Sequence, residues 1–229
     1  MTYTPEQISQ INLKMNLSLQ EKRDLAMSTS SADILRSLAT DEDFFVRWEV
    51  AYNSNTPEDV LRTLATDRDS LVLQEVSKHP NTPEDVLRSL ASNKDSTVRW
   101  SVSKNTNTSE EVLRTLATDE NLYARIGVAQ NPNTPEDTLR SLATDEDFWV
   151  RYWVAHNTNT PEDAIRTLAK ETLRKQLAKE IEEDAIRYHF NPNYKPGPYK
   201  TLELTKVQYY ALKQLIDSCK NTDLLNINI

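Results

Sequence analysis

Apolar and polar positions recur along the middle of the chain with a period of 26 residues, and each period holds two short helical stretches. In one copy the first stretch carries Leu61, Leu64 and Ala65, a spacing that places them on one face of a helix. The second stretch carries small apolar residues four apart, such as Val46 and Val50. The pattern predicts two helices per repeat, and the shortness of the second leaves partly 3₁₀ geometry open.

A helix-start signal precedes each predicted first helix. Threonines 26 residues apart open the signal: Thr56, Thr82, Thr108, Thr134 and Thr160. In four of these copies Pro, Glu and Asp follow, as in residues 56–59. Thr suits the N-cap, Pro suits the first helical position, and an acid three residues after the cap can complete a capping box. The second helix is expected to begin at an acidic cap, as in residues 41–43, and to end in an Asn- and Pro-rich turn, as in residues 131–133.

Helices of about ten residues cannot bury their apolar faces alone, but stacked copies can, which is the basis of a solenoid. The array shows no strand-like alternation, and the chain has only 2 glycines, which argues against a protein of many β-turns. The predicted fold class is therefore all-α, a superhelical α-solenoid with a small irregular C-terminal segment. The predicted parts are a degenerate N-terminal capping repeat at 1–29, the repeat array at 30–169, a capping helix at 170–190, and a Pro-rich linker with a helix and a short apolar tail at 191–229.

The N-terminal part is expected to hold two helices. Thr4 is placed to cap the first, and Ser18 with Glu21 has the spacing of a capping box for the second. Terminal repeats of a solenoid depart from the consensus because one of their faces meets water.

The repeat resembles the leucine-rich repeat variant family. The motif reads Asn-x-x-Thr-Pro-x-x-x-Leu-x-x-Leu-Ala-x-Asp and then Val-Arg-x-x-Val-Ala-x-Asn, and residues 131–157 carry nearly all of it. The resemblance implies alternating α- and 3₁₀-helices in a right-handed superhelix without a sheet. It implies no single catalytic activity. The unit is slightly longer than the usual family repeat, and no segment matches the Cys-rich iron–sulfur module that some members carry.

The second helix also resembles a HEAT repeat. The Asp-x5-Arg spacing of HEAT repeats recurs here as Asp41/Arg47, Asp119/Arg125 and Asp145/Arg151. With Arg99, these residues are expected to form a structural ladder of Arg and acidic side chains across repeats. An anion-binding ladder is the functional alternative for the same column.

Composition narrows the function classes. The formal net charge is −8, and residues 31–170 hold 24 acids against 15 Lys and Arg, so polyphosphate is repelled and nucleic acid is a disfavoured partner. A single cysteine, Cys219, allows no internal disulfide and no Cys-based metal site. No apolar run suits a signal peptide or a membrane span, which predicts a cytoplasmic protein without a membrane partner. No cofactor, metal site or catalytic constellation is expected, and the chain is predicted not to be an enzyme.

Comparison of the copies points to one face of the second helix. Columns that are constant serve the shared architecture, whereas the columns of residues 45, 48, 49 and 52 vary and contain all 4 Trp of the chain. Aromatic side chains are favoured as interface anchors. A continuous strip of these columns is predicted to bind a partner protein or peptide, through Phe45, Trp48, Tyr52, Trp100, Lys104, Tyr123, Trp149, Tyr152, Trp153 and His156.

Two alternatives remain open at the sequence level. Some of these rings would instead pack between layers or against the caps. An alternative function is a nucleic-acid-binding, HEAT-like solenoid, because Arg47 and Trp48, like Arg99 and Trp100, combine a phosphate-binding and a stacking side chain.

Overall fold

The computed structural model describes residues 17–170. The expected helix at Thr4, the capping helix beyond residue 170, and the linker, helix and tail of 191–229 lie outside the described residues. The chain divides into two compact units, Met1–Thr134 and Pro135–Ile229, and each is described by itself.

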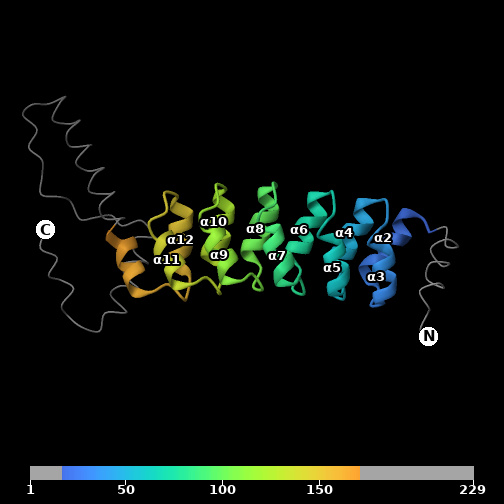
Figure 1. Ribbon diagram of the computed structural model, residues 1–229, viewed down its shortest axis with the longest axis horizontal. Coiled ribbons are helices and arrows are strands. Elements are labelled where there is room, and N and C mark those ends of the chain that lie inside the picture. Colours follow the sequence, from blue (N-terminus) through green and yellow to red (C-terminus); the bar gives the residue numbers. More distant parts are fainter. Residues whose placement is uncertain (1–16, 171–229) are drawn as a thin grey trace, which may run out of the picture. The chain divides into compact units, whose positions relative to one another are not determined.

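Every element in the described part of the chain is a helix (Figure 1). The first unit contains α2 (Leu19–Ser28), α3 (Ala32–Leu38), α4 (Phe44–Tyr52), α5 (Glu58–Leu64), α6 (Ser70–Lys78), α7 (Glu84–Leu90), α8 (Ser96–Lys104), α9 (Glu110–Leu116) and α10 (Leu122–Gln130). In the described part of the second unit lie α11 (Glu136–Leu142), α12 (Phe148–His156) and helical residues 162–170. The predicted all-α repeat architecture, two helices in each repeat, is confirmed.

The second helices are α-helices, so the 3₁₀ geometry that the sequence left open, and that the family resemblance implies, is not found within them. Each of α4, α6, α8, α10 and α12 has 9 residues. Hydrogen bonds of the i→i+3 type occur at the ends of both kinds of helix: Thr66 N–H donates to the Thr63 carbonyl after a first helix, and Asn105 N–H donates to the Val102 carbonyl at the end of a second helix. Capping explains the difference: a carboxylate or amide fixes the start of each second helix, and nine residues then close full α-helical hydrogen bonds.

The second helices of the first unit pack directly on one another, in the order α2, α4, α6, α8, α10. Valines four residues apart fill the contact, and Val46, Val50, Val72 and Val76 are fully buried. Leu35, Leu61 and Leu87 supply the buried face of the first helices. The columns inferred to be architectural therefore form the core. The α2 helix occupies the place of a second helix in this stack, so the repeat geometry begins before residue 30.

The threonines that recur every 26 residues do not cap the first helices, contrary to the expectation. The N-cap of α5 is Pro57, without a side-chain hydrogen bond, and Thr56 is fully buried. Its hydroxyl donates instead to the Val50 carbonyl at the end of α4, at 2.5 Å. The carbonyls of the last helical turn lack intrahelical partners, so a buried hydroxyl there satisfies a polar group that water cannot reach.

The predicted caps of the second helices are confirmed. Asp43, Asp69, Asp95 and Asp147 each accept a hydrogen bond from the backbone N–H two residues later, and Asn121 does the same in α10. The capping box of Ser18 and Glu21 is also present at the start of α2. These short polar signals are readable in sequence because their partners lie within three residues.

A column of buried asparagines ties each turn to the preceding repeat. The Asn105 amide donates to the carbonyls of Ser77 and His79, at 2.8 and 3.1 Å, and Asn131 donates to those of Ser103 and Asn105. Asn53 bridges in the same way to the end of α2. In this column the second repeat has His79 in place of asparagine.

Candidate interaction surface

The variable columns form an exposed aromatic strip on the first unit. We define the strip by its members on α2, α4, α6, α8 and α10: Arg23, Phe45, Trp48, Tyr52, Leu71, Lys78, Trp100, Lys104 and Tyr123. Tyr52 is 56% exposed, Leu71 51% and Tyr123 61%, whereas Trp48 and Trp100 are half-buried. Isolated exposed apolar residues are ordinary, but apolar side chains on each of four stacked helices, such as Trp48, Leu71, Trp100 and Tyr123, are typical of an interaction surface.

On α4 the rings of Trp48 and Tyr52 stack one turn apart. Their centroids are 5.4 Å apart and their planes differ by 13°. One turn toward the N-terminus, the guanidinium of Arg23 lies 4.9 Å from the centroid of Phe45. A stacked ring pair that is partly exposed offers a flat apolar platform to another molecule.

A second ring pair joins α8 to α10. The centroids of Trp100 and Tyr123 are 6.3 Å apart, and the ammonium of Lys104 lies 5.2 Å from the centroid of Trp100. Gly127 allows the two helices to approach. A Cβ placed on it would lie 1.9 Å from the Ser103 hydroxyl oxygen and 3.2 Å from Cγ of Lys104. Because Gly127 has no side chain, α8 and α10 lie close enough for the rings of Trp100 and Tyr123 to meet.

The accessible charge of the strip is positive, although the chain is acidic. The Glu49 side chain is 10% exposed and bound by Arg23, and the Glu75 side chain is 14% exposed and bound by Lys78 at 3.2 Å. The side chains of Arg23 and Lys78 are more open, at 31% and 45%. The strip thus presents cations outward and holds its carboxylates beneath them.

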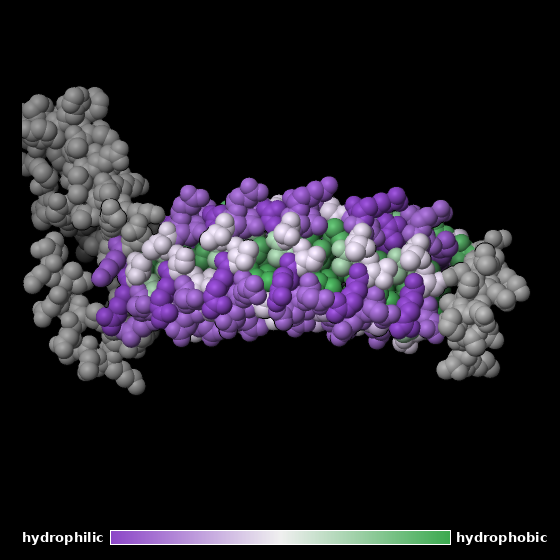
Figure 2. Space-filling model, in the orientation of Figure 1, coloured by the Kyte–Doolittle hydropathy of each residue, from purple (hydrophilic) through white to green (hydrophobic). Residues whose placement is uncertain are grey.

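The acidic surface lies at the starts of the first helices. Exposed carboxylates gather there: Glu58, Asp59, Glu84, Asp85, Glu110 and Glu111. Several bind an arginine of the preceding repeat, as Asp59 binds Arg36, although exposed pairs of this kind contribute little stability. Over the helices of the first unit, Figure 2 shows hydrophilic residues along the edges of the visible face and less polar residues between them.

The predicted residues on α12 form a separate cluster in the second unit. Tyr152 lies at its centre, with ring centroids 5.7 Å from Trp149, 5.3 Å from Trp153 and 4.1 Å from His156. Trp149 is 54% exposed, whereas Tyr152 and Trp153 are half-buried. Residues 149, 152, 153 and 156 lie on one face of α12 because they are three or four residues apart, which matches the period of the helix.

Two arginines of the predicted ladder bridge adjacent repeats from buried positions. Arg47 donates to both carboxylate oxygens of Asp67, at 2.6 and 3.0 Å, and also to the carbonyl of Asp41. Arg99 binds Asp119 in the same bidentate way. Burial is the largest single influence on the pKa of Asp119 and acts to raise it. The hydrogen bonds from Arg99 and from the Asn121 N–H, together with the charges of Arg99 and Arg125, outweigh burial, and the pKa lies below its ordinary value.

The remaining ladder residues take part differently. Arg125 and Arg151 donate to the carbonyls of Asp119 and Asp145, six residues earlier in their own repeats. The side chain of Asp41 binds Lys22 of α2. The guanidinium groups of this arginine column bind backbone carbonyls and carboxylates of the repeats themselves. These contacts support a structural role for the column.

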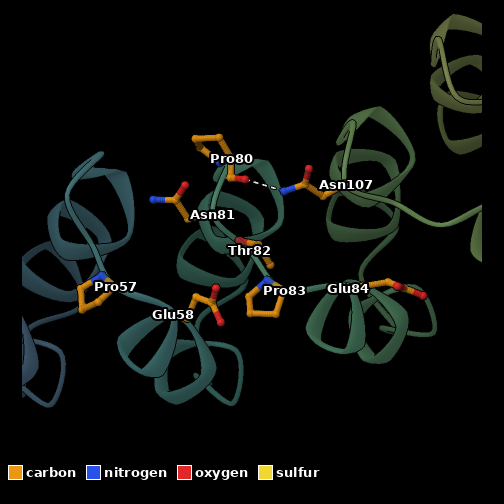
Figure 3. Close-up of a pocket in the computed structure, with 8 residues that line it drawn as sticks. All are labelled: Pro57, Glu58, Pro80, Asn81, Thr82, Pro83, Glu84 and Asn107. Carbon is orange, nitrogen blue, oxygen red and sulfur yellow. Dashed lines mark hydrogen bonds between the residues drawn. The ribbon is translucent and has the colours of Figure 1, made fainter.

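A cleft at the turns before α5 and α7 has no comparable apolar character (Figure 3). Its lining includes Pro57, Pro83 and the carboxylates of Glu58 and Glu84, and the amide of Asn107 binds the Pro80 carbonyl across it. Among the residues described, no group of three or more His, Cys, Asp or Glu is placed to hold a metal ion. No helix in the described part is both long and apolar enough to cross a membrane.

Three residues of the strip escaped the sequence-based selection. Leu71 and Lys78 belong to the variable columns but are not aromatic anchors. Arg23 precedes Glu49 by one repeat of 26 residues, so the period itself assigns it to the strip. Continuing the 26-residue period to residues before 30 would have identified Arg23 from the sequence.

Comparison with known proteins supports the repeat assignment. A family model described as leucine rich repeat variant matches residues 124–147. A solved structure described as a leucine-rich repeat variant with a novel repetitive motif is 28% identical, with a TM-score of 0.54. The match covers 69% of this chain and 64% of that one, so the chain spans less than two thirds of the length of that protein.

A second solved structure is more distant. It is the archaeal HEAT-like repeats protein from Thermococcus onnurineus NA1, 14% identical, covering 95% of this chain and 98% of that one, with a TM-score of 0.41. No curated protein matches the sequence. The predicted resemblance is confirmed: in repeat motif and in fold, this chain is similar to the leucine-rich repeat variant proteins.

Proposed function

We propose that the chain is a non-catalytic scaffold that binds a partner protein or peptide through the aromatic strip. The observation that carries the proposal is the contrast within each second helix. The core side holds buried Val or Ala in every repeat, whereas the opposite side is variable and exposes rings at 43 to 61% on α4, α10 and α12. Variation on an exposed, ring-bearing face is typical of recognition, because the core places no demand on it.

The α12 cluster is proposed as a second contact region. Trp149, Tyr152, Trp153 and His156 stack on one another and leave Trp149 largely open. Trp and Tyr side chains are enriched among the residues that carry most of the binding energy of interfaces. The repeat framework itself is typical of extended binding surfaces.

Nucleic-acid binding is the second candidate. It rests on the same rings and on the strip cations, which together could stack on bases and contact phosphate. The net charge of −8 opposes it, because a polyphosphate strand also meets the acidic starts of the first helices.

The test is a peptide-display selection on the full chain. The selected peptides would be measured by fluorescence anisotropy against wild type and against a strip variant, Phe45→Ser/Tyr52→Ser/Tyr123→Ser, which changes only exposed residues. The matched control is Arg62→Ser/Arg88→Ser/Arg114→Ser on exposed positions of the first helices. Peptides that bind wild type and the control but lose at least about tenfold affinity for the strip variant support the proposal.

Equal binding to all three proteins contradicts the strip as the binding face. Circular dichroism of each variant establishes that the helices are intact. A labelled single-stranded oligonucleotide that binds more tightly than any selected peptide would favour the second candidate instead.

A further inference from the structure

We infer that the strip accepts an extended acidic peptide that carries an apolar or carboxylate side chain at every third position. The inference rests on the proposed binding function and specifies the chemistry of the partner. It is carried by the charge of the strip, by the order of side chains along it and by the spacing of the repeats.

The charge argument begins with what a partner would touch. Glu49 and Glu75 lie beneath the cations that bind them, with side chains 10% and 14% exposed. Lys78 and Lys104 are exposed and stand at equivalent positions of α6 and α8. A carboxylate arriving on the strip therefore meets ammonium groups before it meets another carboxylate.

A basic partner fits the same surface poorly. Arg23 already lies over the ring of Phe45, and Lys104 already lies over that of Trp100. At Phe45 and Trp100 these contacts occupy a ring face that a cation from a partner would otherwise seek. Added Lys or Arg would meet like charge, which costs affinity and selects against such partners.

The net charge does not prevent an acidic peptide from binding here. At physiological ionic strength charges are screened over about 8 Å, so the local lysines act on a short peptide more strongly than distant carboxylates do. A long polyanion differs, because its charge extends over the acidic edges as well.

The order of the side chains sets the pattern of the partner. The stack presents the Trp48 and Tyr52 platform on α4, then Lys78 on α6, then Lys104 on α8 beside the Trp100 and Tyr123 pair. An apolar residue suits the first position and carboxylates suit the next two. Rings flanking the last position also accept an apolar neighbour.

The repeat spacing sets the conformation of the partner. Packed helices lie about 8–10 Å apart. A polyproline II segment advances about 3.1 Å per residue and returns to the same face every three residues, which is about 9.3 Å. Each third side chain of such a peptide would therefore lie over a successive second helix, and prolines between these positions would reduce the ordering cost.

The experiment uses fluorescein-labelled synthetic ten-residue probes and the full chain. The first probe has leucine and then glutamate at every third position, with proline between. A second replaces glutamate with lysine, and a third moves the glutamates to every fourth position. The protein variants are Lys78→Glu/Lys104→Glu and, as a matched control, Lys94→Glu, an exposed lysine in the turn before α8.

Wild type and Lys94→Glu are expected to bind the first probe alike, and the double variant to bind it about tenfold more weakly. The lysine probe should bind the double variant more tightly than wild type. Equal binding of the first probe by wild type and the double variant would overturn the inference, as would preference of wild type for the lysine probe or for the four-residue spacing.

The outcome is separable from that of the broader proposal. If display peptides bind in a strip-dependent way while the acidic probe does not bind, the scaffold function stands and the acidic chemistry is wrong. If neither binds, both fail.

Discussion

His79 performs the task that asparagine performs in the neighbouring repeats. Its Nε2 lies 3.0 Å from the Asn53 carbonyl, and its Nδ1 accepts the Asn81 N–H at 3.1 Å. A carbonyl can only accept, so Nε2 carries the proton and Nδ1 does not. The ring is therefore held in its neutral form at a buried position between two repeats.

This geometry makes stability depend on pH. Burial lowers the pKa of His79, although the Asn53 carbonyl and the charge of Glu75 act in the opposite direction. The unfolded chain takes up the proton first, near the ordinary value of about 6.5. The stabilisation is thus fully present above about pH 6.5 and is lost as pH falls toward the folded pKa.

We expect the free energy of unfolding of wild type, from urea titrations, to fall between pH 7 and pH 5.5. His79→Asn should reduce that dependence, because asparagine makes the same two contacts without titrating, as Asn105 does. An identical pH slope in the two proteins would show that His79 does not contribute.

Neighbouring side chains on α8, and not an unusual backbone conformation, explain why residue 127 is glycine. No residue in the described chain has a positive φ. Alanine would ordinarily stabilise a helix interior by about 1 kcal/mol relative to glycine. Here the added Cβ would meet Cβ of Ser103 at 3.0 Å and its hydroxyl oxygen at 1.9 Å.

Gly127→Ala is therefore expected to destabilise the protein, by about 1–2 kcal/mol after the helix-propensity gain is offset. Chemical denaturation followed by tryptophan fluorescence measures the loss. Adding Ser103→Gly should recover much of it, because that change removes both clashing atoms. If Gly127→Ala alone increases the free energy of unfolding, α8 and α10 can move apart to accommodate the methyl group without loss of stability, and the prediction is wrong.

At the scale of elements, buried Arg–Asp pairs link α4 and α8 to the turn of the repeat that follows each of them. Arg47 and Asp67 are paired, with side chains 8% and 6% exposed, and so are Arg99 and Asp119. The second repeat has Leu73 in the arginine column, and the matching acid position holds Asn93. The repeat that lacks the arginine therefore also lacks the aspartate, as expected if the two side chains depend on each other.

A double-mutant cycle tests this dependence. Arg47→Leu alone should cost about 3 kcal/mol, because it leaves the Asp67 carboxylate buried without its partner. Arg47→Leu/Asp67→Asn reproduces the combination of the second repeat and should recover a substantial part of that loss. Additive losses in urea unfolding would show that the two side chains do not depend on each other.

At the scale of the molecule, stability is spread over contacts between neighbouring repeats. The stack from α2 to α10 has no single centre, and buried leucines and valines recur in every repeat. Nearest-neighbour coupling of this kind makes the effects of a mutation local.

Leu87→Ala, at a fully buried position of α7, is expected to cost about 2–5 kcal/mol. Hydrogen–deuterium exchange should accelerate most in α6, α7 and α8 and least in α2 and α3. Uniform acceleration over the first unit would indicate one cooperative block in place of coupled repeats.

The sequence by itself determined the repeat, the helices, their acidic caps and the buried valine and leucine columns. These features depend on partners within one or two helical turns, and such spacings are visible in a single chain. It also placed the rings on the exposed side of the second helices, because helical period fixes which columns oppose the core.

Tertiary structure decided the contacts between repeats, whose partners lie 19 to 28 residues apart. It determined that the threonine hydroxyls bind the end of the preceding helix, that His79 replaces asparagine between two repeats, and that Arg23 lies over the ring of Phe45. It also let Gly127 set the approach of α8 and α10. Periodicity shows that such positions recur, but only packing shows which atoms meet across the stack.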